Sequence, residues 1–474
     1  MRWLPSPLLL LFYAALMLLV LEDFRGVMGD EAAYADPALR WCEGRGFTSA
    51  AWWQSPDAFW AANVPLYAVI NAAWVKFTGM SSLWGLRSLS LLLYVAGLAL
   101  WMAACRRVGW FKSVAQEVVF LAMILGSLYA TAPSQYIRPE AVAPLLLGLG
   151  LWGQTLSREA MRDVMAFATG ALAAWAGFQF AVTLGVLVIV WVAAADAKPW
   201  RAFVSCILGG VTGFGVLVAV YAYFGVLGVF VESTFGHGGN RLAQWHGLRD
   251  PMLWAGSAVL ATGLALRLWA VREQRWALAG LAAGPGLAGV LFLLSKFPQY
   301  YGFLAVLPVC TATAAVFPAL RKNWRLAAGS ILALAGLSGF PLAALTNWNA
   351  MPSRNHEELS RWAAERLTGC KTAYVDPSAY FAARGQGRQI YTQFVLPALT
   401  TGERSRIDAV MLIPGHPLGY LQKESVLQLL GGEWELDGTY PENSTGPSRF
   451  PALDIFRRFS YAGPYQFELW RRVQ

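Results

Sequence analysis

The sequence LPSPLLLLFYAALMLLVL at residues 4–21 is followed shortly afterwards by GDEAAY at residues 29–34. The first stretch is almost wholly apolar, and about 17–25 such residues are enough for a helix to cross a bilayer. The second stretch opens with two adjacent carboxylates, Asp30 and Glu31. A membrane helix that leads directly into paired acids places them at the membrane surface, where an enzyme acting on a lipid-carried substrate needs a general base.

The composition of the whole chain is that of a polytopic membrane protein. Of 474 residues, 57% are hydrophobic and only 14% are charged, whereas soluble domains are about one quarter charged. We predict a polytopic α-helical membrane protein with about 11 transmembrane helices, because that number of apolar stretches has close to the required length. They are roughly 4–21, 84–104, 114–131, 140–156, 163–177, 180–195, 202–224, 251–270, 276–294, 300–319 and 326–346.

The basic residues indicate how the helices are oriented. A net charge of +9 in a soluble protein would suggest a nucleic acid partner, but here Lys and Arg lie in short gaps between apolar runs, so we expect none. The positive-inside rule predicts a cytoplasmic N-terminus, with the long first loop (22–83) and the C-terminal region outside. The gaps assigned to the cytoplasm contain Arg2, Arg106, Arg107, Lys112, Arg158, Arg162, Lys198, Arg201, Arg267, Arg272, Arg275, Arg321, Lys322 and Arg325.

The composition changes after about residue 346. We predict a transmembrane domain over 1–346 and a small extracytoplasmic α/β domain over 347–474. Within the latter, helical spacing is expected at 357–367 and 425–430, and strands at 372–375, 407–413 and 465–470. Within the first loop, 64–78 is expected to be a helix along the membrane face. A disulfide between Cys42 and Cys370 is an open alternative, since both lie outside in this topology.

Asp30 and Glu31 have two interpretations. In one, a carboxylate deprotonates an acceptor hydroxyl at the membrane face. In the other, the two acids only mark the start of a helix, where the positive end of the helix dipole favours negative charge. The local pattern by itself favours the second interpretation. Asp57, also in the first loop, is expected to be an ordinary surface acid.

Two further groups lie at predicted outer helix ends. Arg138-Pro139-Glu140 suits a helix start, and Arg138 could hold a phosphate bidentately. Lys296, Tyr300 and Tyr301 could anchor the chain at the headgroup level or contact a phosphate. Because these groups and the first-loop acids share one side of the membrane, their coincidence favours a functional site.

The loop 232–250 contains two histidines, His237 and His246. Their spacing does not place them on one helical face, so they could bind a metal ion only with partners from other loops. The alternative is a solvated, flexible loop.

The order of these elements resembles that of the GT-C glycosyltransferases, and most closely the branch with the protein O-mannosyltransferases and the lipid A aminoarabinose transferases (glycosyltransferase family 39-like). The resemblance covers about the first 350 residues. It rests on Gly29-Asp30-Glu31, Val64-Pro65-Leu66-Tyr67, Phe77-Thr78-Gly79, Leu86-Arg87-Ser88-Leu89, Arg138-Pro139-Glu140, and Lys296 to Tyr301 with Leu307-Pro308. The chain departs from this pattern at Glu140, where relatives often have Asp, and at Phe178-Gln179-Phe180, where a Lys is common.

This resemblance implies an inverting transferase in a bacterial-type inner or plasma membrane. It would move a sugar from a polyprenyl-phosphate donor to a hydroxyl of a protein, lipid or glycan, with no certain cofactor or with one divalent metal ion. The implied general base is Asp30, with Glu31 and Glu140 orienting the acceptor or a metal. Arg138 and Lys296, with Tyr300 and Tyr301, would bind the donor phosphate.

Two other classes of protein are open on the sequence. A transporter of polyprenyl lipids or solutes should have ionisable residues near the bilayer midplane, whereas the acids here gather at the outer rim. A catalytically inactive relative that binds a lipid-linked sugar is the second alternative, and the Phe178-Gln179-Phe180 turn keeps it open.

Overall fold

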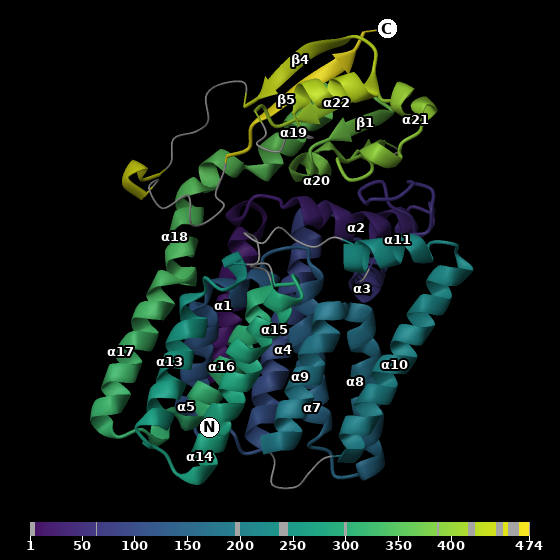
Figure 1. Cartoon of the computed structure of the whole chain (residues 1–474). Coiled ribbons are helices and arrows are strands. Elements are labelled where there is room, and N and C mark those ends of the chain that lie inside the picture. Colours follow the sequence, from purple (N-terminus) through teal and green to yellow (C-terminus); the bar gives the residue numbers. More distant parts are fainter. Residues whose placement is uncertain are drawn as a thin grey trace.

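The computed structural model describes residues 5–62, 64–194, 200–236, 245–297, 301–385, 388–415, 422–441, 449–453 and 464–473. Long helices form a bundle, and a small mixed sheet with its own helices sits on one end of it (Figure 1). The prediction of a polytopic α-helical membrane protein with a small C-terminal α/β unit is confirmed.

Every predicted apolar stretch coincides with a helix or with consecutive helices. Within the ranges just given, six helices are long and apolar enough to cross a membrane, or up to seven if the pair α5–α6, bent by 84°, is one span. The number of spans therefore stays a prediction, but the chain is a multi-pass membrane protein. The bundle helices are α1 (Pro5–Phe24), α4 (Leu83–Arg107), α5 (Val114–Gly126), α6 (Leu128–Thr131), α7 (Val142–Gly153), α8 (Glu159–Ala176), α9 (Phe178–Ala194), α10 (Trp200–Tyr223), α13 (Pro251–Ala265), α14 (Val271–Leu281), α15 (Leu287–Leu293), α16 (Gly302–Val316), α17 (Lys322–Ser338) and α18 (Phe340–Ala350).

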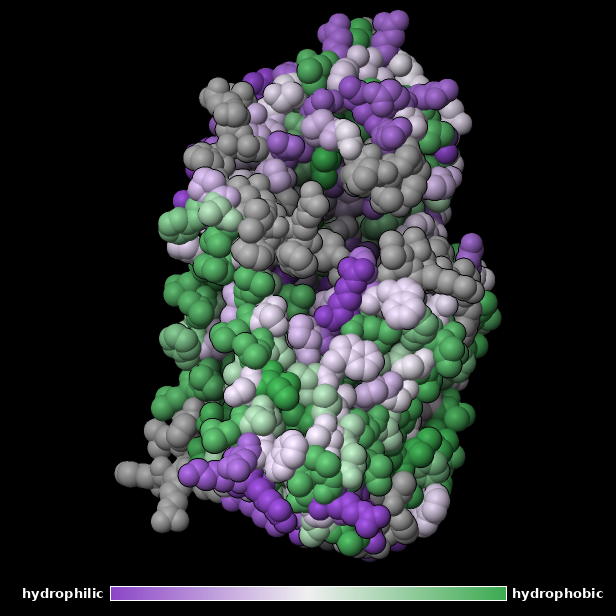
Figure 2. Space-filling view, turned by 60° about the vertical axis from the view of Figure 1, so that its left-hand side comes forward, coloured by the Kyte–Doolittle hydropathy of each residue, from purple (hydrophilic) through white to green (hydrophobic). Residues whose placement is uncertain are grey.

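The surface of the bundle is apolar, as a lipid environment requires. On the face drawn in Figure 2, hydrophobic residues cover most of the bundle, and hydrophilic residues gather at its lower end and on the C-terminal unit. Large side chains such as Leu19 and Leu334 point outwards, with 83% and 69% of their surface exposed. The two chain ends lie at opposite ends of the molecule (Figure 1). Which end faces the cytoplasm stays a prediction from the charge pattern.

Glycines allow α8 and α10 to pack backbone against backbone. A Cβ added to Gly209 would lie 2.0 Å from the carbonyl oxygen of Phe167, and one added to Gly170 would lie 2.1 Å from that of Cys206. Small residues at such a crossing are the usual means of close packing between membrane helices. The α8–α10 pair packs against α9, and α8 also packs against α7.

In the part of the C-terminal unit that the structure describes, five strands form a sheet of order β2-β1-β3-β5-β4. The strands β2, β1 and β3 are parallel, and β5 runs antiparallel to both β3 and β4. The predicted helices and strands are present, whereas β2 and β4 were not predicted. The elements are α19 (His356–Arg366), β1 (Thr372–Val375), α20 (Tyr380–Ala383), β2 (Gln389–Tyr391), α21 (Thr401–Ser405), β3 (Ala409–Leu412), α22 (Lys423–Leu430), β4 (Trp434–Tyr440) and β5 (Phe467–Arg472).

The first loop joins the two parts of the molecule. It contains α2 (Gly29–Cys42) and α3 (Pro65–Thr78), the second of which is the helix predicted at 64–78. Helix α2 lies between the bundle and the C-terminal unit (Figure 1). Its buried Asp36 accepts hydrogen bonds from the Tyr380 hydroxyl at 2.5 Å and from the Ala50 N–H at 2.6 Å. The C-terminal unit is therefore hydrogen-bonded directly to α2, the helix whose first turn contains Asp30 and Glu31.

The cysteines do not form the bridge that the sequence left open. Cys42 and Cys370 are both free thiols. The Cys42 thiol donates to the Ala72 carbonyl at 3.4 Å, and the Cys370 sulfur accepts from Arg471 at 3.1 Å.

Candidate functional site

Helix α2 begins where the sequence places its acids. The N-cap is Met28, and the Glu31 side chain accepts a hydrogen bond from the Met28 N–H at 2.8 Å. Asp30 and Glu31 both lie in the first turn, where the unpaired N–H groups of the helix favour negative charge. The interpretation of these acids as a helix start is therefore locally correct, and the contacts beyond the helix distinguish their roles.

Glu31 is held entirely inside the protein. Its two oxygens accept hydrogen bonds from Arg87 at 2.9 and 2.8 Å, and one of them also accepts from the Ile137 N–H at 2.9 Å. Neither side chain of the Glu31–Arg87 pair has any exposed surface. The same guanidinium donates to the carbonyls of Leu21 and Arg25, both at 2.9 Å, at the end of α1. Glu31 thus ties together α1, α2, α4 and the loop before Arg138.

Asp30 and Glu140 share one arginine. The Arg138 guanidinium forms an ion pair with Asp30 and a bidentate pair with Glu140 at 3.1 and 3.0 Å. It also lies over the ring of Tyr34, 5.6 Å from the centroid. Glu140 is in the short 3₁₀ turn Pro139–Ala141 that opens α7, with the proline at its first position as predicted. The sequence motifs around residues 30 and 140 are therefore brought into direct contact.

Solvent exposure separates the three acids. The Asp30 side chain is 33% exposed, whereas Glu140 is 1% exposed and Glu31 is fully buried. Of these three carboxylates, only Asp30 is open to an incoming substrate. Glu31 and Glu140 are placed to fix the positions of the arginines and of α2.

The second predicted phosphate-binding group lies before α16. Lys296 is half-buried in the connection between α15 and α16, and burial lowers the pKa of its ammonium group. Tyr301 caps α16 and packs edge-on against Phe180, with 5.9 Å between ring centroids. The next residue, Gly302, lies so close to Tyr129 that an added Cβ would be 2.6 Å from its ring. This places the start of α16 beside α6, which leads into the Arg138 loop. Tyr300 lies outside the described residues.

The predicted metal ligands are not tested by the structure. His237 lies outside the described residues, and His246 is half-exposed near Arg249. Over the described ranges, no three His, Cys, Asp or Glu side chains are grouped so that they could hold a metal ion. Of the acids that the resemblance assigned to the acceptor or a metal, Glu31 pairs with Arg87 and Glu140 pairs with Arg138.

Two polar residues of the site were not assigned roles from the sequence. Arg87 is the partner of Glu31. The sequence feature that could have indicated this is an arginine within an otherwise apolar helix. Burying its charge in a membrane costs free energy, so such an arginine usually has a partner or a function. Gln179 is 5% exposed at the start of α9, and its amide oxygen is buried without a hydrogen bond among the described residues. Gln179 stands in the turn where the resemblance leads one to expect a lysine.

The architecture can now be compared with known proteins. No protein-family model matches the chain, and no curated protein matches it in sequence. Among solved structures, the crystal structure of ArnT from Cupriavidus metallidurans bound to undecaprenyl phosphate superposes with a TM-score of 0.51 over 85% of this chain and 92% of that one, at 15% identity. The fold is GT-C-like. The apo structure of the same ArnT gives the same TM-score, at 16% identity and with 85% and 91% of the two chains covered.

The prediction of a GT-C-like fold is therefore confirmed. At this identity the likeness concerns the fold, and the roles of individual residues depend on the geometry described above.

Proposed function

We propose that the protein is an inverting glycosyltransferase that moves a sugar from a polyprenyl-phosphate donor to an acceptor hydroxyl, with Asp30 as the general base. One observation carries the proposal: Asp30 is the solvent-accessible member of a set of three carboxylates, held in place by Arg138 at the end of a GT-C-like bundle. The undecaprenyl phosphate bound by the structurally similar ArnT supports a donor of this class.

The proposed chemistry is a single in-line displacement. The acceptor oxygen attacks the anomeric carbon as its proton passes to the Asp30 carboxylate, and the bond between that carbon and the phosphate oxygen breaks. The phosphate leaves with the bonding electrons. Because the acceptor oxygen attacks from the face opposite the phosphate, the configuration at the sugar inverts. A positioned base of this kind contributes about 10²–10⁴-fold to the rate.

Positive charge on the leaving side would stabilise the phosphate. Most of the described donor groups of Arg138 are directed to Asp30 and Glu140, so its main part is to orient the base and to offset its charge. Lys296 is the half-buried cation that we assign to the phosphate itself. Charge that is fixed in advance and partly shielded from water stabilises a developing anion more than charge in bulk solvent does.

The remaining parts of the proposal concern partners and location. The acceptor, a protein, lipid or glycan hydroxyl, would approach from the side of the C-terminal unit, because that unit adjoins α2. By the charge pattern this side is extracytoplasmic, in a bacterial-type inner or plasma membrane. No step is assigned to a metal ion, since Glu31 pairs with Arg87 and Glu140 pairs with Arg138.

The direct test compares Asp30→Asn with wild type in donor turnover. Purified protein in detergent is incubated with a panel of radiolabelled polyprenyl-phosphate sugars, and both donor binding and release of polyprenyl phosphate are measured. We expect Asp30→Asn to lose about 10²–10⁴-fold in release while still binding donor. Asp57→Asn changes an exposed carboxylate of the same loop and should behave as wild type.

Each outcome separates the candidate functions. Release by wild type and by Asp57→Asn, but not by Asp30→Asn, supports the transferase with Asp30 as its base. Equal release by Asp30→Asn would show that another group is the base. Binding without release by wild type, even with candidate acceptors present, would favour the inactive relative. Failure to bind any donor would refute the glycosyltransferase proposal and favour a transporter.

A further inference from the structure

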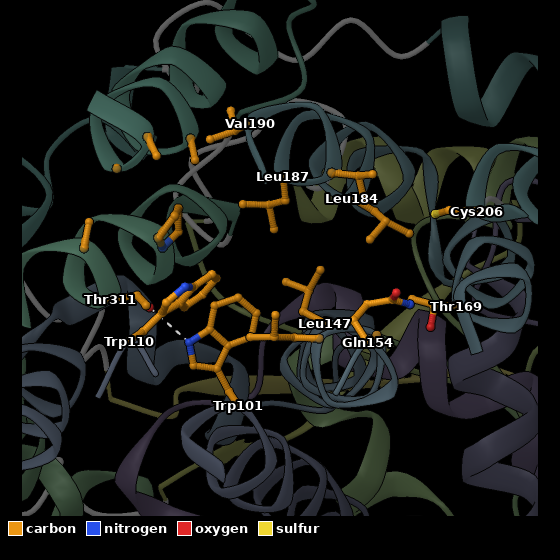
Figure 3. Close-up of a pocket in the computed structure, with 18 of the residues that line it drawn as sticks. Trp101, Trp110, Leu147, Gln154, Thr169, Leu184, Leu187, Val190, Cys206 and Thr311 are labelled. Carbon is orange, nitrogen blue, oxygen red and sulfur yellow. Dashed lines mark hydrogen bonds between the residues drawn. The ribbon is translucent and has the colours of Figure 1, made fainter. Parts of the chain in front are cut away.

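The acceptor side of the proposed site is the junction between the first loop and the C-terminal unit. The cavity drawn in Figure 3 lies elsewhere: it has a volume of about 130 Å³ inside the bundle, and residues such as Leu147, Leu184 and Leu187 point into it. None of the described residues that line it is an acid. Asp30, by contrast, is at the start of α2, which lies between the bundle and the C-terminal unit (Figure 1).

Hydrogen bonds hold the first loop against the C-terminal unit at this junction. The Ala50 N–H donates to Asp36 of α2 at 2.6 Å, and the Ala50 carbonyl accepts from the Thr392 N–H at 3.2 Å. Residues 50–53 of the first loop and residues 392–394 after β2 are therefore joined to each other and to α2. Side chains from these two short segments are held in place beside the start of that helix.

An aromatic surface is exposed at the junction. The Trp53 ring packs on the Phe394 ring, with 4.3 Å between centroids, and Trp53 is 41% exposed. Phe394 in turn adjoins the start of α2, because a Cβ added to Gly29 would lie 3.6 Å from the end of its ring. One ring therefore separates the exposed indole from the residue that precedes Asp30.

Gln393 lies beside the same residue of α2. Its side-chain nitrogen would be 3.7 Å from a Cβ added to Gly29. Its side-chain oxygen is buried and has no hydrogen-bond partner among the residues that the structure describes, although buried polar atoms are normally paired. The last torsion of a glutamine side chain turns with little restriction, so this oxygen can move to the exposed side of the amide and accept a hydrogen bond from a bound hydroxyl.

The two features together fit a carbohydrate. A sugar ring has C–H groups on its faces and hydroxyl groups around its edge, so a flat aromatic surface binds it when a neighbouring polar side chain fixes its orientation. An indole that only anchored the bundle at the bilayer surface would pack on a bundle helix, whereas Trp53 packs on Phe394 of the C-terminal unit.

We infer that the acceptor is a glycan of at least two sugar residues, one of which stacks on Trp53 beside Gln393 while its neighbour presents the reacting hydroxyl to Asp30. The stacked and the reacting sugars are different residues because the Phe394 ring lies between Trp53 and the start of α2. The inference rests on the proposed function, since it names the acceptor of the same transfer. Trp53 and Gln393 take no part in the displacement, so their loss should act on the KM for the glycan and leave kcat and donor binding nearly unchanged.

The test adds acceptors to the donor-release assay and measures transfer of the labelled sugar. Cellotriose, maltotriose and chitotriose are compared with their monosaccharides, with a peptide rich in Ser and Thr, and with phosphatidylglycerol. We expect transfer to at least one trisaccharide, with a KM about tenfold or more below that of its monosaccharide. Trp53→Ala should raise the trisaccharide KM about tenfold, the upper range for one aromatic contact, while kcat and donor binding stay at wild-type values.

Trp41→Ala is the matched control. Trp41 is a 50% exposed tryptophan near the other end of α2, where it packs on Phe47, and its loss should leave the KM unchanged. Trp53→Phe keeps a flat ring and should restore most of the wild-type KM. Gln393→Leu keeps a side chain of similar size without the amide, and should raise the KM about two- to tenfold through loss of one hydrogen bond.

Each outcome supports or overturns the inference. Transfer to the peptide or the phospholipid but to no trisaccharide, or to no acceptor although donor is bound and released, would overturn it and leave the proposed function intact. An unchanged trisaccharide KM in Trp53→Ala would also overturn it. So would a parallel loss of kcat and donor binding, which would mark a structural role for Trp53. If wild type binds no polyprenyl-phosphate sugar, the proposed function itself fails, and the acceptor assignment fails with it.

Discussion

The buried Glu31–Arg87 pair allows a prediction that separates structure from catalysis. Glu31→Gln would leave the guanidinium of Arg87 uncompensated at a position with no exposed surface. The amide N–H groups that the substitution introduces would also face hydrogen-bond donors. In the wild-type protein the Glu31 oxygens accept from Arg87, from the Met28 N–H and from the Ile137 N–H. Breaking a buried ion pair at one partner costs about 3–5 kcal/mol. We therefore expect Glu31→Gln to lower the free energy of unfolding by about that amount.

A double-mutant cycle tests the origin of this loss. Arg87→Met removes the unpaired charge, so Glu31→Gln combined with Arg87→Met should be less destabilised than the sum of the single variants by about 2 kcal/mol or more. Full recovery is not expected, because Arg87 also donates to the carbonyls at the end of α1. Asp30→Asn, at a side chain that is 33% exposed, should change stability by less than about 1 kcal/mol.

Unfolding can be followed in mixed detergent micelles with a thiol-reactive dye, in a Cys42→Ser, Cys206→Ser background that removes the exposed and the half-buried thiol. Cys105 and Cys310 are buried and become reactive only when the bundle opens. The reasoning is refuted if Glu31→Gln is as stable as wild type, or if the two substitutions are simply additive. Either result would mean that the interaction between Glu31 and Arg87 does not contribute to the free energy of unfolding.

Two further predictions follow from the packing and from the charge of the site. Gly209→Leu should overpack α8 against α10 and lower the thermal midpoint in the same dye assay, at a cost of about 1–3 kcal/mol or more. Gly215→Leu on the same helix should be tolerated, since nothing outside the helix's own backbone lies within 4 Å of its added Cβ. Equal effects of the two substitutions would contradict the close crossing. Binding of undecaprenyl phosphate should weaken by about tenfold as the pH rises through the lowered pKa of Lys296, because the neutral amine loses a charged hydrogen bond. Lys296→Arg stays charged at alkaline pH and should abolish that dependence, and a wild-type affinity that is flat with pH would exclude Lys296 as the phosphate ligand.

Much of the fold could be predicted because each element carries a local signal. A span must hide its backbone polar groups within one helix, so its length and apolar composition are visible in the sequence itself. The strands β1 and β3 are buried nearly throughout and stand out as short apolar runs. In contrast, β2 has three residues and β4 is largely exposed, so neither has a pattern that distinguishes it from a loop.

The candidate site was only partly predictable for a related reason. The sequence indicated that Asp30, Glu31, Arg138 and Glu140 lie on one side of the membrane, since helix ends and charge bias fix sidedness. The local pattern did not distinguish Asp30 from Glu31, although the Asp30 side chain is open to solvent and Glu31 is buried. Glu140 pairs with Arg138 in its own motif, whereas the arginines that meet Glu31 and Asp30 lie far along the chain. No local pattern encodes which distant arginine meets which of these two acids.

The sequence by itself thus determined that the chain crosses the membrane many times and that adjacent acids begin a helix at its surface. Bilayer thickness and the helix dipole act on contiguous residues, so both leave their mark in the order of the amino acids. Only the tertiary structure decided that Arg87 pairs with the buried Glu31 and that Arg138 pairs with both Asp30 and Glu140. Those features depend on the angles and distances at which separate helices pack. Packing of the helices brings Glu31 into contact with Arg87 and with the Ile137 N–H, although these residues are more than 50 positions away in the sequence.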